Sequence, residues 1–96
     1  MEQEIVEYME KFIWDIDAQT KFKQLMERIP AVMQGMAGHA VLKVVSRILE
    51  KEGKTEVSEK VLVDAFFTAT PFGFHGPMKA DMAKLGINYT QYGHPQ

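Results

Sequence analysis

A single stretch, residues 30–52, has the pattern of one long helix and constrains the fold more than any other part of the chain. Pro30 suits the first turn of a helix, and Gly53 follows the last charged residues as a stop. Apolar residues recur in pairs at each turn, as in a wide stripe that packs against more than one neighbour and unlike the narrow seam of a coiled coil. The pairs are Val32 and Met33, Met36 and Ala37, Ala40 and Val41, Val44 and Val45, and Ile48 and Leu49. The pattern predicts an uninterrupted central helix that the other segments cover.

Two amphipathic helices are expected before the central one. Residues 1–13 are predicted to form an N-terminal amphipathic helix with apolar residues at helical spacing: Ile5, Tyr8, Met9, Phe12 and Ile13. A second helix is expected to run to about residue 28, with Asp15 or Asp17 as its N-cap. A break at residues 14–17 separates the two, and one continuous helix is the alternative. The second helix is predicted to bury one face and to leave the other solvated, the buried residues being Ala18, Phe22, Leu25, Met26 and Ile29, and the solvated ones Lys21, Lys23, Gln24 and Glu27.

The second half of the chain contains two shorter helices. A short extended piece near residues 55–57 leads to Ser58, a good N-cap for a helix over residues 59–68 that stops before Thr70-Pro71. Residues 71–77 are rich in helix breakers and are expected to form a loop. A helix is expected over residues 77–85, and residues 87–96 are expected to form a flexible tail. The predicted fold is all-α, a small single-domain bundle of four to five helices, divided into residues 1–13, 14–68, 69–86 and 87–96.

Composition excludes several classes of function. At 96 residues the chain is long enough for one hydrophobic core and too short for two. Cysteine is absent, which excludes disulfides, thiolate nucleophiles and cysteine-ligated metal clusters. A net charge of -2 disfavours nucleic acid as a partner. The acidic start lacks a secretory signal and no stretch is apolar enough to cross a bilayer, so we expect a soluble cytoplasmic protein without a membrane partner.

Part of the chain resembles a known family. The features that carry the resemblance are Trp14 followed by a helix, the turn Arg28-Ile29-Pro30, the segment Gly35-Met36-Ala37, a helix that ends at Gly53, and Glu56-Val57-Ser58 at the entry to a helix with Val61 and Ala65. In this order and spacing they resemble the small helical domain at the C-terminus of the B subunit of light-independent protochlorophyllide reductase, which also occurs as a free-standing protein. The resemblance covers residues 14–68 in our division.

Two departures limit what the resemblance implies. The family usually carries basic residues where this chain has Gln34 and Gly38, so the basic character of that helix face is reduced. The reductase also needs a catalytic body with iron–sulfur clusters and an ATP-dependent partner, which a cysteine-free chain does not contain. The resemblance therefore implies a detached accessory or binding module of the PCP reductase-like family, without reductase activity of its own.

Two candidate sites lie in or near the central helix. Gly35 and Gly38 each cost the helix about 1 kcal/mol relative to alanine, which indicates either close contact at a helix crossing, the interpretation we favour, or close approach of a ligand. His39, Lys43 and Arg47 are spaced by one turn and form a row that could bind a carboxylate or phosphate, although such a row is more often a solvated face.

A third candidate site is the aromatic segment Phe72-Gly73-Phe74-His75. Two exposed aromatic rings on a glycine-hinged loop would suit a flat apolar ligand or a partner's groove. We slightly favour the alternative, in which Phe72 and Phe74 fold back over the end of the core.

The three histidines, His39, His75 and His94, have no metal-ligand spacing. A histidine with a methionine could bind a tetrapyrrole iron, but the nearby methionines are better explained as core residues: Met33, Met36, Met78 and Met82. No catalytic constellation is found.

Three functions are compatible with these features. The first is an accessory or binding module with a protein partner. The second is a histone-fold-like DNA-associated protein, because a helix, a long helix, a short strand and a helix follow one another in that order; the slightly acidic composition weighs against it. The third is a module that forms homodimers through the apolar stripe of its N-terminal helix, with Ile5, Met9 and Phe12 at the contact.

Overall fold

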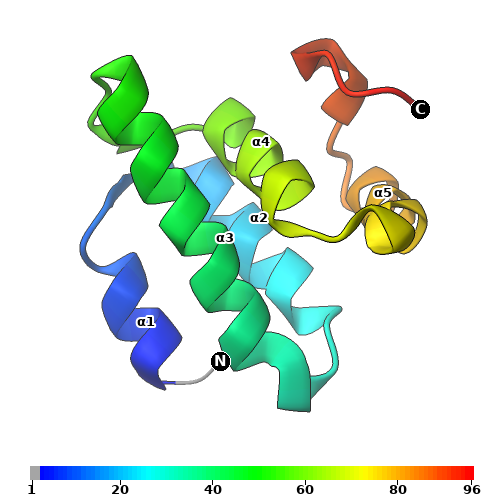
Figure 1. Ribbon diagram of the computed structural model, residues 1–96, viewed down its shortest axis with the longest axis horizontal. Helices are drawn as coiled ribbons and strands as arrows, with labels where there is room; N and C mark the ends of the chain where they lie inside the picture. The colour runs from blue at the N-terminus through cyan, green and yellow to red at the C-terminus, as the bar shows by residue number, and fades with distance from the viewer. Residues whose placement is uncertain (1–2) are drawn as a thin grey trace.

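Helix α3, Ala31–Glu52, runs the length of the molecule in a computed structural model that describes residues 3–96 (Figure 1). Pro30 is its N-cap, and Gly53 ends it in the left-handed conformation with φ 64°, which glycine adopts without strain. The helix continues without a break through Gly35 and Gly38. The predicted central helix, the all-α class and the bundle of five helices are therefore confirmed.

The N-terminal helix α1 is shorter than predicted. It spans Gln3–Met9 and is followed by a turn and by strand β1, Ile13–Trp14, so Ile13 is not helical; residues 1 and 2 of the predicted helix lie outside the described part. The indole Nε1 of Trp14 donates to the carbonyl of Met9 at 2.8 Å, which satisfies an acceptor at the end of the helix. Because a turn and a strand separate α1 from the next helix, the alternative of one continuous helix is excluded.

Helix α2, Ile16–Glu27, lies behind α3 and buries the face that was predicted (Figure 1). Asp15 is at its N-cap position, but its side chain makes no capping hydrogen bond. Two expectations fail. Ile29 lies beyond the end of the helix and is only half-buried, and Lys21 is half-buried and pairs with Glu59 of another helix instead of remaining in solvent.

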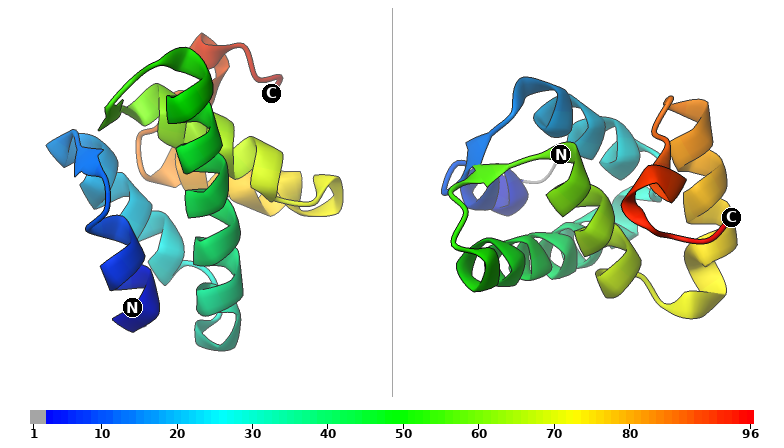
Figure 2. Two further views of the ribbon diagram at one scale, coloured as in Figure 1. Left: turned by 60° about the vertical axis from the view of Figure 1, so that its left-hand side comes forward. Right: turned by 90° about the horizontal axis from the view of Figure 1, so that it is seen from above.

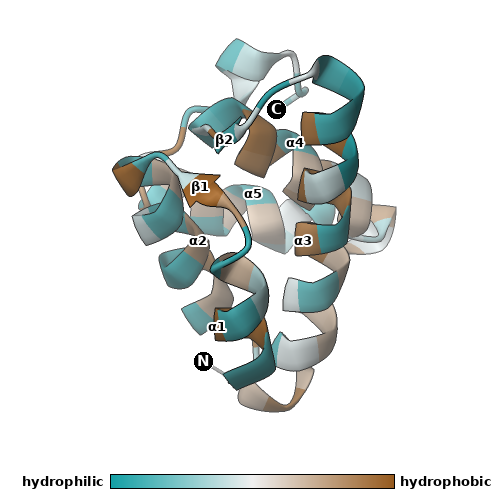
Figure 3. Cartoon of the chain, turned by 90° about the vertical axis from the view of Figure 1, so that its left-hand side faces the viewer, coloured by the Kyte–Doolittle hydropathy of each residue, from teal (hydrophilic) through white to brown (hydrophobic). Residues whose placement is uncertain are grey.

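Strand β2, Glu56–Val57, pairs in parallel with β1 (Figure 3). Ile13 lies opposite Glu56 and Trp14 opposite Val57, and the amide of Asp15 continues the pairing with a hydrogen bond to the Val57 carbonyl at 3.1 Å. The extended piece near residues 55–57 was predicted, whereas its partner strand was not.

Helix α4, Glu59–Ala69, packs against α3 and α2 and forms the centre of the core. The hydroxyl of Ser58 accepts a hydrogen bond from the amide of Val61 at 3.2 Å, as expected for an N-cap. The core has contributions from every helix, and its fully buried large side chains are Ile5, Phe22, Met26, Leu42, Val45, Val57, Val61, Leu62, Val63 and Met82. Within residues 3–96, none of the helices has the length and apolar content needed to cross a membrane.

The segment predicted as a loop is helical. Residues Phe72–Phe74 form a 3₁₀ turn, η1, and helix α5 spans His75–Lys84, so it begins two residues before Pro77. Phe72 is 88% exposed and Phe74 is 60% exposed. Our expectation that these rings cover the end of the core is wrong.

The C-terminal segment is docked on α4, in contrast to the flexible tail that was predicted. Ile87 is buried in the core, and residues Tyr89–Tyr92 form a second 3₁₀ turn, η2. The ring of His94 stacks on Phe67 with centroids 4.0 Å apart, and its Nε2 lies 2.6 Å from Asp64. Polar and aromatic contacts that the residue pattern does not show therefore fix this segment.

Candidate functional site

The first half of α3 carries large apolar side chains that nothing in the described chain covers. Val32 is 91% exposed and Met36 is 79% exposed, and Met33 and Ala40 are exposed as well. We call these four residues the apolar patch. The sequence predicted them as part of a covered stripe, which is wrong because the first turns of α3 extend beyond α4 (Figure 2, left). In the second half of α3 the predicted residues Val41, Val44, Val45 and Leu49 are buried, and Ile48 is half-buried.

Helix α1 covers only one side of this half of α3. An added Cβ at Gly38 would lie 2.9 Å from Cε of Met26 and 3.1 Å from Cδ1 of Ile5, so Gly38 lies at a close helix contact. Gly35, one turn earlier, is half-exposed and lines the surface beside α1.

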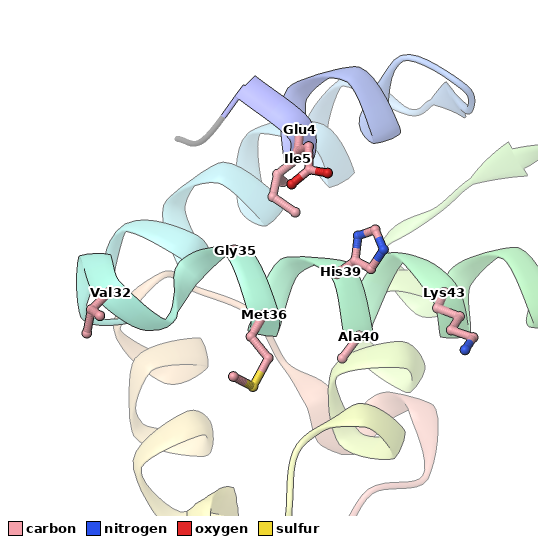
Figure 4. A pocket seen from close by; sticks show the side chains of 8 residues that line it. All are labelled: Glu4, Ile5, Val32, Gly35, Met36, His39, Ala40 and Lys43. Atoms are coloured by element: carbon pink, nitrogen blue, oxygen red, sulfur yellow. The ribbon is translucent and has the colours of Figure 1, made fainter.

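An open depression of about 570 Å³ lies over α3 at this point. Its lining combines apolar side chains, one glycine and three ionisable groups: Glu4, Ile5, Val32, Gly35, Met36, His39, Ala40 and Lys43. In Figure 4 Glu4 and Ile5 lie on the α1 side, whereas Val32, Met36 and Ala40 point to the opposite side of α3. The ring of His39 packs edge-on against Tyr8 of α1, with centroids 5.1 Å apart. Because its lining residues lie on both sides of α3, the depression is an open surface along the helix and not an enclosed cavity.

Basic side chains continue this surface along the second half of α3. Lys43 and Arg47, predicted as candidates, are exposed, and so is Lys51 at the next one-turn step. None of these three, which we call the basic row, forms an ion pair with another residue in the range 3–96. Lys51 was missed because it was interpreted only as part of the charged helix end, although its spacing from Arg47 repeats the i, i+4 step.

The aromatic candidates lie elsewhere. In Figures 1 and 2, η1 and α5 lie on the side of α4 remote from α1, so Phe72 and Phe74 do not share a surface with His39. Nε2 of His75 lies 3.1 Å from the carbonyl oxygen of Phe67 and 2.9 Å from that of Thr70, and its ring packs edge-on against Phe67. His75 therefore holds the start of α5 against the end of α4.

The carboxylates near the core are engaged in structural contacts. Glu59 bonds Lys21 and accepts a hydrogen bond from the hydroxyl of Tyr92 at 2.9 Å. Partial burial, and after it this bond to Glu59, raises the pKa of Tyr92 to about 12. The next residue of α4, Lys60, donates a hydrogen bond to Asp64, and this bond raises the pKa of Lys60.

Residues 3–96 contain no group of three or more His, Cys, Asp or Glu side chains arranged to hold a metal ion. The methionines considered for a tetrapyrrole divide into two pairs: Met78 and Met82 are core residues as expected, and Met33 and Met36 are exposed.

Comparison of the chain with protein-family models, with characterised proteins and with solved structures gives no match. The resemblance to the reductase domain therefore stays a prediction from residues 14–68, and any function has to be argued from the surface itself.

Proposed function

We propose that the chain is a non-catalytic binding module that contacts a partner protein through the apolar patch on α3. The exposure of Val32 and Met36 carries this proposal. Complete burial of a side chain of this size contributes about 1.5–3 kcal/mol, and the two lie one turn apart on one helix. An apolar patch bordered by charged residues is typical of a protein contact site.

An accessory role, as the resemblance to the protochlorophyllide reductase domain implies, fits such a surface. A detached module of that family would act by contact with other proteins. In this chain the family's two basic positions are occupied by the neutral Gln34 and the buried Gly38. The basic row lies further along the same helix.

Site-specific photo-crosslinking in the native cell tests the proposal. A benzophenone side chain placed at position 32 or 36 is expected to form a covalent adduct with one discrete partner protein. Ile16 is a matched control position, because it is 78% exposed on a different helix, α2. Adducts of equal yield from position 16, or no adduct from positions 32 and 36, would contradict the proposal.

The two alternative functions have less support. The order α2, α3, β2, α4 keeps the histone-like sequence of elements, but β1 precedes α2 and pairs with β2 of the same chain. Ile5 and Met9, the expected dimer contacts, are buried against the chain's own core. A crosslink from position 36 to a second copy of the chain would favour dimerisation over a separate partner.

A further inference from the structure

The outer face of α3 changes character along its length. Its first half carries the apolar patch, and its second half carries the basic row. Lys43 follows Met36 by seven residues and Ala40 by three, so the two surfaces are continuous on one side of the helix. A partner that covers the apolar patch along the helix axis therefore also reaches Lys43 and Arg47.

Basic side chains outnumber acidic ones at one end of this face, where Lys43, Arg47 and Lys51 flank the exposed Glu50, and the other end of the face is the start of a helix. The basic row has no ion-pair partner among the described residues, although the chain as a whole has a net charge of -2. At the other end, the first turn of α3 contains no acidic residue, and Pro30 provides no capping side chain for the positive end of the helix dipole. The complementary partner is acidic opposite the basic row and apolar opposite the patch.

The fold already contains one contact of this kind. Helix α1 is short, acidic and amphipathic: Glu4 and Glu7 are exposed, whereas Ile5 packs against α3 at Gly38. On the other side of α3, no helix of the described chain covers Val32 and Met36 (Figure 4).

We propose that the occupant of this face is an amphipathic α-helix of a partner protein, antiparallel to α3, with acidic residues in its N-terminal half and apolar residues in its C-terminal half. This inference rests on the proposed function and specifies the partner. In the antiparallel direction, the acidic half lies over Lys43 and Arg47 and also complements the partner helix's own N-terminus. The carbonyl end of the partner helix then lies near the uncapped start of α3.

A displayed library of helical peptides tests the inference on the intact chain. The peptides carry a fixed apolar stripe, and every polar position varies among acidic, basic and neutral residues. We expect selection to enrich Asp and Glu in the N-terminal half of the bound peptides. A nitroxide label at the N-terminus of a selected peptide is expected to broaden the amide resonances of Arg47 and Lys51 and to leave that of Val32 sharp.

Substitutions in the chain test the apolar patch and the basic row separately. Met36→Ser and the double variant Lys43→Glu, Arg47→Glu are each expected to weaken binding of a selected peptide by about tenfold or more. Ile16→Ser is the control for the first, and Lys23→Glu with Lys84→Glu is the control for the second, since all three residues are exposed outside α3. The controls are expected to leave affinity unchanged, and circular dichroism checks that every variant is folded.

The outcomes distinguish this inference from the proposed function. Peptides that depend on Met36 but show no acidic preference, or that bind in the parallel direction, overturn the inference and leave the proposed function standing. Failure to select any peptide sensitive to Met36→Ser overturns both. Met36-dependent binding to vesicles of phosphatidylcholine and phosphatidylserine, without peptide binding, also overturns both in favour of a membrane surface.

Discussion

At Gly38 the side chains of Ile5 in α1 and Met26 in α2 lie so close to α3 that an added Cβ would meet them. Glycine is unfavourable inside a helix by about 1 kcal/mol relative to alanine, and here that cost is offset by the packing of α1. Gly73 gives the opposite case, because an added Cβ there meets no atom within 4 Å.

Substitution of Gly38 by leucine is expected to lower the free energy of unfolding by about 1–3 kcal/mol, the usual cost of overpacking, because Ile5 has to move away from α3. Denaturant unfolding followed by circular dichroism measures the change. Gly73→Leu is the matched control and is expected to stay within about 0.5 kcal/mol of the unsubstituted chain. Equal losses in the two variants would show that the contact at Gly38 does not determine the cost.

The contact of Tyr92 that docks the C-terminal segment is expected to weaken at alkaline pH. Its pKa is raised from 10.0 to about 12 in the folded chain, so the folded state holds the phenol proton more tightly than the unfolded state. The resulting stability is fully present below about pH 10 and is lost as the pH rises towards 12. Between these values, the free energy of unfolding is expected to fall more steeply in the unsubstituted chain than in Tyr92→Phe. Tyr8→Phe, which removes a hydroxyl without a hydrogen bond to any of residues 3–96, should keep the steep fall.

At the scale of elements, the start of α4 has a side-chain N-cap. The Ser58 hydroxyl satisfies the amide of Val61, and the helix that follows supplies six buried residues to the core. Helix α2 begins differently, since Asp15 at its N-cap position makes no side-chain hydrogen bond.

Removal of the Ser58 hydroxyl in Ser58→Ala is expected to destabilise the chain by about 1 kcal/mol, because a helix amide loses its acceptor. Thermal unfolding by calorimetry gives the change. Asp15→Ala tests the same position in α2 and is expected to cost less, since only the interaction of its charge with the helix dipole is lost. A larger loss for Asp15→Ala would contradict this account of the two helix starts.

At the scale of the whole molecule, the apolar patch is small for a dimer interface. A stable dimer usually buries roughly 800 Å² on each partner, and the apolar patch consists of four side chains on two turns of one helix. We therefore expect the isolated chain to sediment as a monomer over the micromolar range. A concentration-dependent dimer that Met36→Ser abolishes would show instead that a second copy occupies this surface.

Sequence periodicity predicted which residues of the chain form helices better than which helices cover one another. Pro30 and Gly53 delimit α3 because helix ends have local chemical requirements. The exposure of Val32 and Met36 could not be predicted, since periodicity identifies an apolar side but not how far the neighbouring helices reach. The candidate site was therefore half predicted: Lys43 and Arg47 were chosen, and the apolar patch beside them was assigned to the core.

Contacts between distant residues were missed for the same reason. Ile13 continued the helical spacing of the residues before it, and only its pairing with Glu56, far along the chain, makes it part of a strand. His94 followed a stretch without periodicity, and its stacking on Phe67 depends on where the end of the chain comes to lie.

The parallel pairing of β1 with β2 also limits the order in which the chain can fold during its synthesis. Trp14 leaves the ribosome early, but its partner Val57 emerges only after all of α3. Until then β1 has no backbone partner, and α1, α2 and α3 lack the helix α4 that completes their common core. A nascent chain arrested before residue 56 should therefore remain open to proteases, and one arrested after α4 has left the exit tunnel should become resistant.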